Sequence, residues 1–371
     1  MNERLEKLAE AGVSIWLDDL SRSRLTSGSL AEMIEQKSVT GVTTNPSIFA
    51  TALGDSESYA EQLAELVAAN PELDAEDAIR ELTTTDVADA CDLFSDLNEE
   101  TDGVDGRVSI EVAPDLAMDA EATVEQAVEL FEKVDRSNVL VKIPATVPGL
   151  EAIRRVIGQG ISVNVTLIFS IERYRDVMDA WMSGLEDALE AGLDIDEIHS
   201  VASFFVSRVD SEVDKRLDEI GTDEARALKG RAALANARIA YAAWLEVMTS
   251  ERWGRLKLRG AHPQRPLWAS TGVKDPAHPD TMYVSGLVAE DCVNTMPEKT
   301  MEAFADHGET DGDTITEAID EAVETMGALA SVGIDMDDVV TQLEEEGVFK
   351  FVTSWEELVG TVGAAVEAAK A

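Results

Sequence analysis

The segment Val139-Leu140-Val141-Lys142-Ile143 places one lysine inside a run of apolar residues that favour a β-strand. Side chains alternate between the two faces of a strand, so Val139, Val141 and Ile143 share one face and Lys142 lies on the other. An ammonium group without a partner is costly to bury. The face that carries Lys142 must therefore point toward other polar groups.

The same alternation recurs in three further predicted strands, at 13–18, 108–112 and 162–169. Each has an apolar face and an opposite face with polar groups near its carboxyl end. These polar residues are Ser14 and Asp18, Ser109 and Glu111, and Asn164 and Thr166. If the apolar faces pack on helices, the polar groups converge inside a barrel, at the end where barrel active sites lie. Solvated strand ends are the alternative, which four strands in one register disfavour.

Strand-like runs alternate with helical patterns along the whole chain, which predicts a parallel sheet. The eight runs are Val13–Asp18, Gly41–Thr44, Val108–Val112, Val139–Ile143, Ser162–Phe169, Ser200–Phe204, Pro266–Thr271 and Cys292–Thr295. Eight strands in 371 residues predict an α/β fold of the (β/α)₈ TIM-barrel type, as a single domain over 1–371. A doubly wound open sheet is the alternative, but no G-x-G-x-x-G or P-loop motif follows the first strand.

Helical spacing fills the intervals between these strands. It appears at Leu30–Gln36, Ala120–Val134, Ile171–Ala191, Asp223–Thr249, Thr300–His307 and Thr314–Val332. The interval from Thr51 to Asp105 is long enough for two or three extra helices after strand two. Further helices are expected at the termini, where Ser354–Ala371 would form a closing helix.

Acidic residues outnumber basic ones 74 to 30, which gives a formal net charge of −44. Such a surface repels nucleic acid and anionic membranes, and neither is an expected partner. The acidity predicts solubility or, as a sharper hypothesis, adaptation to a salty cytosol in which screening hides self-repulsion. The charged N-terminus and the two widely spaced cysteines fit a cytoplasmic protein. Neither metal spacing nor a histidine triad is present, so we expect no metal and no cofactor.

A lysine inside a barrel can act as a nucleophile. A neutral amine attacks a ketone and forms an imine, an electron sink that allows the adjacent C3–C4 bond of a ketose to break. This chemistry needs a group for the C4 hydroxyl proton and a proton shuttle for imine formation, which Asp18 and Glu111 can supply. A simple ion pair between Lys142 and one of these carboxylates is the alternative.

Four segments resemble the transaldolase family, in the family's order and over essentially the whole chain. Gly41–Ser47 resembles the T-T-N-P-S signature, and Val139–Thr146 resembles the segment of the active-site lysine. Ser162–Ser170 is similar to the fifth-strand pattern N-x-T-L-x-F-S, and Ser203–Asp210 to the sixth-strand pattern S-x-F-x-x-R. The length and the segment Trp268–Lys274 resemble the longer, actinobacterial-type branch.

The resemblance implies a role for each matching position. Lys142 would be the Schiff-base nucleophile, Asp18 would handle the C4 hydroxyl proton, and Glu111 with Thr166 would hold a proton-shuttling water. The implied substrate-binding residues are Asn45 and Asn164 for the hydroxyls, Ser203 for the same pocket, and Arg208 for the phosphate. Sugar phosphates would be the small-molecule partners, while monomer and homodimer both stay open.

The chain departs from the family pattern just after strand seven. Many members carry a second phosphate-binding arginine there, whereas this chain has Ser270-Thr271-Gly272-Val273-Lys274. Lys274 is the substitute that the sequence offers. A further ambiguity concerns Asp18 and its neighbour Asp19, between which strand parity favours Asp18.

Each implied site residue also has a simpler interpretation. Asn45 could belong only to a turn before Pro46, and Thr166 could be an ordinary β-branched strand residue. Ser203 could serve packing, Arg208 a surface salt bridge, and Lys274 no function at all.

The implied reaction belongs to the non-oxidative pentose phosphate pathway. A dihydroxyacetone unit moves from sedoheptulose 7-phosphate to glyceraldehyde 3-phosphate, giving erythrose 4-phosphate and fructose 6-phosphate. Two alternatives stay open: a fructose 6-phosphate aldolase-like enzyme that releases dihydroxyacetone, and a non-catalytic barrel that binds sugar phosphates.

Overall fold

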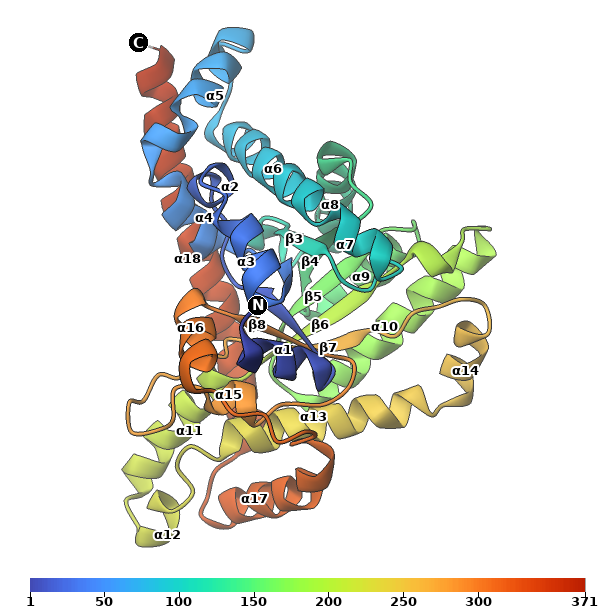
Figure 1. The fold of residues 1–371 in the computed structure, drawn as a ribbon, viewed down its shortest axis with the longest axis vertical. Coiled ribbons are helices and arrows are strands. Elements are labelled where there is room, and N and C mark those ends of the chain that lie inside the picture. Colours follow the sequence, from blue (N-terminus) through green and yellow to red (C-terminus); the bar gives the residue numbers. More distant parts are fainter. Residues whose placement is uncertain (371) are drawn as a thin grey trace.

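The computed structural model describes residues 1–370 and contains eight parallel strands that close into a barrel in sequence order (Figure 1). The strands are β1 Val13–Leu17, β2 Val39–Val42, β3 Arg107–Glu111, β4 Val139–Pro144, β5 Val163–Ile168, β6 Ser200–Phe205, β7 Arg265–Ala269 and β8 Cys292–Met296. The prediction of an eight-stranded TIM barrel is confirmed. Strand two is displaced, because Thr43 and Thr44 follow β2 instead of ending it.

Hydrogen bonds across the barrel confirm the direction in which the polar strand faces point. Asn164 on β5 donates to Ser109 Oγ on β3 at 3.0 Å, although β4 lies between these two strands. Thr43, just after β2, hydrogen-bonds Thr295 on β8 at 2.6 Å, past β1. Side chains of non-adjacent strands can meet in this way only through the barrel interior.

The alternation breaks in β5 immediately after Thr166. Leu167 has a positive φ of 59°, and the pairing of β5 with β6 shifts register between Val165 and Ile168. A bulge of this kind re-aims the side chains that follow it. Strict alternation would place Leu167 and Phe169 on the face of Val165, but after the bulge both lie close to the C-terminal helix, where a β-carbon on Gly347 would be 3.1 Å from Leu167 and 3.5 Å from Phe169.

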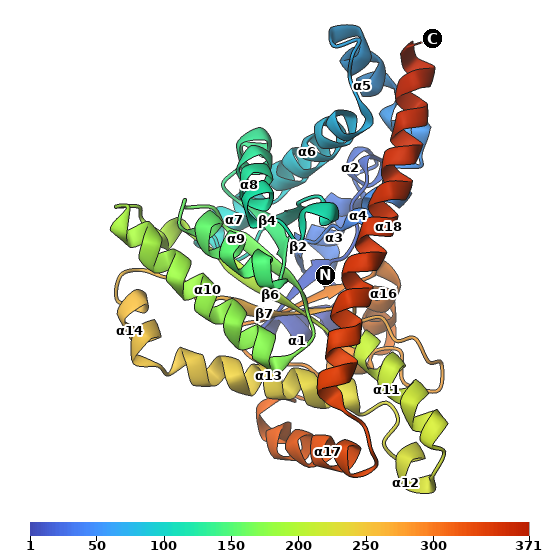
Figure 2. The ribbon, with the colours of Figure 1, turned by 180° about the vertical axis from the view of Figure 1, so that it is seen from behind.

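Helices surround the barrel (Figures 1 and 2). They are α1 Glu3–Glu10, α2 Arg22–Thr26, α3 Ser29–Lys37, α4 Pro46–Leu53, α5 Ser56–Ala69, α6 Ala75–Leu93, α7 Ser95–Glu100, α8 Ala120–Val134, α9 Val147–Ile157, α10 Ile171–Glu190, α11 Ser207–Ile220, α12 Asp223–Arg226, α13 Ala232–Met248, α14 Glu251–Lys257, α15 Met282–Ser285, α16 Glu298–His307, α17 Ile319–Ser331 and α18 Met336–Lys370. No helix within 1–370 is long and apolar enough to cross a membrane.

The helices between the predicted strands agree with the sequence patterns, with one difference in their number. The pattern over 223–249 is two helices, α12 and α13, because the chain turns at Gly230 with a φ of 69°. The extra helices after β2 are confirmed, and α4 to α7 all lie between β2 and β3.

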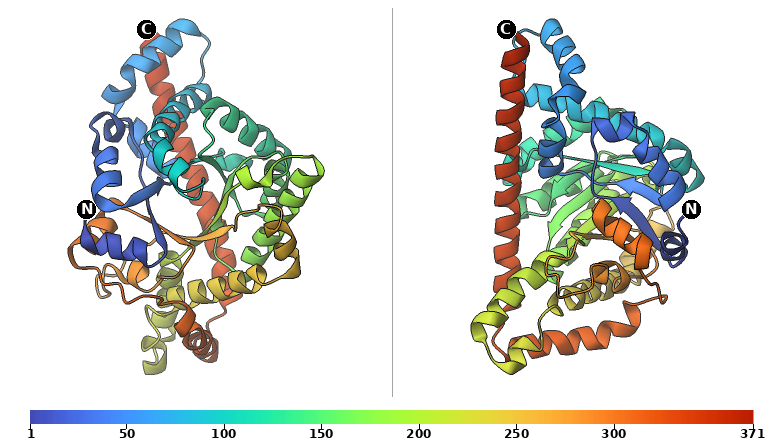
Figure 3. Two further views of the ribbon diagram at one scale, coloured as in Figure 1. Left: turned by 45° about the vertical axis from the view of Figure 1, so that its right-hand side comes forward. Right: turned by 60° about the vertical axis from the view of Figure 1, so that its left-hand side comes forward.

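The C-terminal helix α18 is 35 residues long and lies against the barrel end at which the strands finish (Figure 3). The prediction that it starts at Ser354 is wrong, since it begins at Met336. Contacts with distant parts of the chain hold this longer helix in place, and the local sequence does not reveal them. Glu344 accepts a hydrogen bond from Arg173 at 3.0 Å, and Ser354 bonds Ser47 at 2.7 Å.

Candidate active site

Lys142 and Glu111 form a buried ion pair at the carboxyl ends of β4 and β3. The two residues are register partners, and Lys142 Nζ lies 3.3 Å from Glu111 Oε2. Lys142 Nζ also donates to the backbone carbonyl of Thr44 at 3.0 Å. Lys142 is only 4% exposed, so its amine is largely shielded from bulk water.

Burial raises the pKa of Glu111 to about 7, with a further contribution from the negative charge of Asp18. Lys142 opposes this rise but does not cancel it. Within residues 1–370, neither Glu111 oxygen nor the Thr166 hydroxyl makes a hydrogen bond to the protein. These buried groups can therefore bind a water or substrate, and Glu111 can exchange a proton near neutral pH.

Asp18 follows β1 and faces the same interior. It accepts a hydrogen bond from the Thr43 hydroxyl at 2.8 Å. Burial raises its pKa, and the charge of Lys142 partly opposes that rise. The neighbouring Asp19 instead pairs with Arg24 at 2.5 Å, so the structure brings Asp18, and not Asp19, toward Lys142.

Asn164 and Ser203 belong to one polar layer of the barrel interior. Asn164 lies beside Lys142 in the β4–β5 register and is fully buried. Its Oδ1 accepts a hydrogen bond from the Ser203 hydroxyl at 2.7 Å, while its Nδ2 donates to Ser109. Ser203 thus orients the amide of Asn164, the register partner of Lys142.

Asn45 caps the N-terminus of α4, where its Oδ1 accepts a hydrogen bond from the Ile48 N–H at 3.0 Å. Pro46 occupies the first position of that helix. Asn45 and Pro46 therefore form the turn that starts α4, and this local role does not exclude a role in substrate binding. Asn45 is half-buried, and its Nδ2 group is not used by the cap.

Arg208 is half-buried at the start of α11, with its guanidinium 5.0 Å from the centre of the Phe205 ring. Among the ion pairs within 1–370, none includes Arg208, which argues against the surface salt bridge. The negative charges of Asp18 and Glu346 interact with its guanidinium through space. Lys274 is exposed in the loop after β7.

Phe351 of α18 is a site residue that the sequence patterns do not reveal. Its ring centre lies 6.0 Å from Lys142 Nζ, and it is only 3% exposed. One turn earlier, Gly347 faces Leu167, Phe169 and Arg208. Because the helix was expected only from Ser354, no sequence signal placed this stretch at the barrel mouth.

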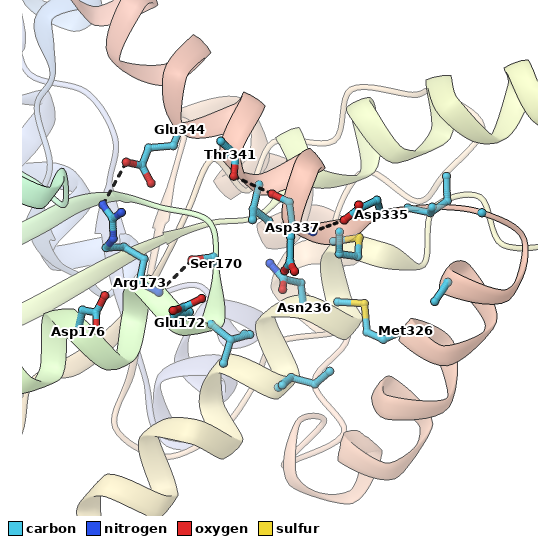
Figure 4. Close-up of a pocket in the computed structure, with 17 residues that line it drawn as sticks. Ser170, Glu172, Arg173, Asp176, Asn236, Met326, Asp335, Asp337, Thr341 and Glu344 are labelled. Carbon is cyan, nitrogen blue, oxygen red and sulfur yellow. Dashed lines mark hydrogen bonds and ion pairs between the residues drawn. The ribbon is translucent and has the colours of Figure 1, made fainter.

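A surface pocket lies outside this cluster, between α10, α13, α17 and α18 (Figure 4). Acidic side chains line much of it, with Arg173 reaching Glu344 across one side. None of its 17 lining residues is among the predicted site residues. The chemistry indicated by Lys142 therefore belongs to the barrel interior and not to this pocket.

The family model described as transaldolase/fructose-6-phosphate aldolase matches residues 15–362. The chain belongs to this family. A transaldolase of Kocuria rhizophila is 60% identical over 370 residues, covering 100% of both chains. Transaldolases of Arthrobacter sp. and Mycolicibacterium smegmatis are each 58% identical, covering 100% of this chain and 99% of theirs. The resemblance to the actinobacterial-type branch of transaldolases is thus confirmed.

Proposed function

We propose that this chain is a transaldolase that transfers a dihydroxyacetone unit through a Schiff base on Lys142. The observation that carries the proposal is the buried Lys142–Glu111 pair with Asp18 beside it, inside the barrel of a transaldolase-family protein. A structural ion pair would account for the contact. It would not account for the Thr166 hydroxyl and the second oxygen of Glu111, which are buried near the lysine without a hydrogen bond to the protein within residues 1–370.

In the proposed reaction, the neutral amine of Lys142 attacks C2 of the ketose. Glu111, through a water shared with Thr166, moves the protons that turn the carbinolamine into the imine and water. Asp18 then accepts the proton of the C4 hydroxyl, the C3–C4 bond breaks, and its electrons enter the imine as an enamine. The aldose product leaves, and the enamine attacks the acceptor aldehyde, whose oxygen takes a proton from Asp18. Water, with its protons moved by Glu111, then hydrolyses the new imine and frees the ketose and the Lys142 amine.

The proposed substrates are sugar phosphates. Sedoheptulose 7-phosphate would donate the three-carbon unit and glyceraldehyde 3-phosphate would accept it, giving erythrose 4-phosphate and fructose 6-phosphate in the cytoplasm. Asn45, Asn164 and Ser203 would hold the hydroxyls. Arg208 would hold the phosphate, since a guanidinium presents a planar fork to phosphate oxygens.

Reductive trapping tests this proposal. Fructose 6-phosphate and borohydride should attach a reduced three-carbon or six-carbon adduct to Lys142, located by peptide mass spectrometry. Lys142→Arg keeps the charge in the ion pair but supplies no neutral amine, and should give no adduct and no turnover. An adduct on another lysine, or full trapping in Lys142→Arg, contradicts the proposal.

Aldolase activity is a second candidate, because the matching family model covers fructose 6-phosphate aldolases as well. The two reactions share every step up to the enamine. They differ in whether the enamine waits for an acceptor or is protonated. Release of free dihydroxyacetone from fructose 6-phosphate without acceptor, at a rate close to that of transfer, would favour the aldolase.

A further inference from the structure

Three cationic side chains gather at the barrel mouth, in a chain that has only 30 basic residues against 74 acidic ones. They are Arg208 at the start of α11, Lys274 in the loop after β7, and Lys350 on α18. Arg208 and Lys274 both act on Lys350, and their positive charges lower its pKa. The charges of Arg208 and Lys274 thus reach Lys350 through space, although the three residues lie far apart in the sequence.

The docking of α18 places Lys350 beside the site. A β-carbon on Gly347 would lie 3.6 Å from Arg208 Nη1, so this turn of the helix faces the guanidinium. Lys350 follows one helical turn later, where residues three apart are surface neighbours. The next residue, Phe351, lies over Lys142. Lys350 thus lies on the stretch of α18 between the guanidinium and the reactive amine.

We propose that Lys350 is the second phosphate-binding cation of this enzyme, so that the substrate phosphate binds between Arg208 and the C-terminal helix. This inference rests on the proposed function. It assigns to α18 the role for which Lys274 was the only candidate in the sequence. Lys274 and Lys350 are both exposed, but Lys274 lies in the loop after β7, next to Asp275 and outside the helical stretch that meets Arg208.

Charge explains why a second cation is needed here. At a net charge of −44, a phosphate dianion is repelled at long range and must be held by local cations. Arg208 supplies a fork of donors, and an ammonium group adds a mobile point charge. Lys350 and Arg208 repel one another without a ligand, and a phosphate between them converts this repulsion into two attractions. Phosphate binding should therefore also hold α18 against the barrel.

The test compares Lys350→Met with Lys274→Met and with Lys257→Met. Lys257 is an exposed lysine at the end of α14 that controls for the loss of one surface charge. In Lys350→Met we expect the KM for fructose 6-phosphate to rise about tenfold or more, because a charged contact to phosphate is lost. We expect kcat to change less, Lys350→Arg to restore KM, Lys274→Met to raise KM less than Lys350→Met does, and Lys257→Met to stay within about threefold of wild type.

Ligands with and without phosphate separate binding from folding. Trapping of dihydroxyacetone on Lys142, which involves no phosphate, should proceed in Lys350→Met at the wild-type rate. Competitive inhibition by inorganic phosphate should weaken in parallel with the KM for fructose 6-phosphate. Hydrogen exchange of α18 should slow when phosphate is added to wild type, and change less in Lys350→Met.

The outcomes distinguish this inference from the proposed function. A KM unchanged in Lys350→Met, or a larger loss in Lys274→Met, overturns the assignment of Lys350 even if borohydride still traps Lys142. Equal loss with dihydroxyacetone and fructose 6-phosphate would show a structural role and overturn it too. Failure of wild-type protein to form any adduct on Lys142 would instead overturn the proposed function.

Discussion

At the scale of single residues, the site depends on three ionisable groups that share one buried space. Lys142 and Glu111 contact each other directly, and Asp18 contributes a second negative charge. Burial raises the pKa of both carboxyl groups, while the ammonium of Lys142 limits the rise. Two acids in different surroundings can therefore take different roles, with Glu111 at the imine and Asp18 at the C4 hydroxyl.

Glu111 should set the acid limb of the pH–rate profile. Its pKa of about 7 means that the carboxylate form, which accepts protons during imine formation, is lost as the pH falls below that value. We expect kcat/KM for fructose 6-phosphate to fall below pH 7 in wild type. Glu111→Gln should lower kcat by about 10²–10⁴ and remove this limb. If kcat/KM of Glu111→Gln still falls below pH 7, a group other than Glu111 sets the acid limb.

At the scale of elements, α18 completes a site that the strands begin. Strands β3, β4 and β5 supply Glu111, Lys142 and Asn164. The helix supplies Phe351 above the amine and lies against Arg208 through Gly347. The bulge at Leu167 belongs to the same contact, because a β-carbon on Gly347 would lie 3.1 Å from that leucine.

Two glycines of α18 offer a matched test of this contact. Replacing a helical glycine by alanine stabilises a helix by about 0.5–1 kcal/mol where nothing opposes the new methyl group. Gly360 has no atom within 4 Å of such a methyl, so Gly360→Ala should raise the unfolding free energy and leave KM unchanged. Gly347→Ala should gain less stability and raise the KM for fructose 6-phosphate. If Gly347→Ala and Gly360→Ala show the same unfolding free energy and the same KM, α18 does not press on the site.

At the scale of the whole molecule, the charge of −44 opposes compaction, and salt screens this self-repulsion. We expect the midpoint of urea unfolding to rise between low and molar potassium chloride. Capture of fructose 6-phosphate should also speed up at moderate ionic strength, before more salt weakens the Arg208 contact. Equal stability at both salt concentrations would contradict adaptation to a salty cytosol.

The same unfolding curves test the organisation of the chain. We propose that 1–371 is one domain, since α18 packs against α4, α5, α6 and α11, which come from both halves of the chain. One cooperative transition is then expected at every salt concentration. Two separated transitions would show that part of the chain unfolds independently.

The sequence alone determined the strand order and the inward direction of Asp18, Glu111, Lys142, Asn164 and Thr166. It could do so because the two-residue alternation of a strand is local, and because an ammonium or carboxylate is excluded from an apolar helix–sheet contact. The family motifs then specified the chemistry that these residues support. Asn45 and Arg208 stay predicted site residues, and only the structure shows the helix cap of the one and the half-buried guanidinium of the other.

Only the tertiary structure decided how the site is closed. The start of α18 at Met336 depends on its contacts with α10 and α4, which lie far away in the sequence. The bulge at Leu167 lies against a helix from the other end of the chain, and no local pattern encodes that contact. Lys350 and Phe351 join the site for the same physical reason: helix packing is set by long-range contacts, whereas the faces of a strand are set by neighbours in the sequence.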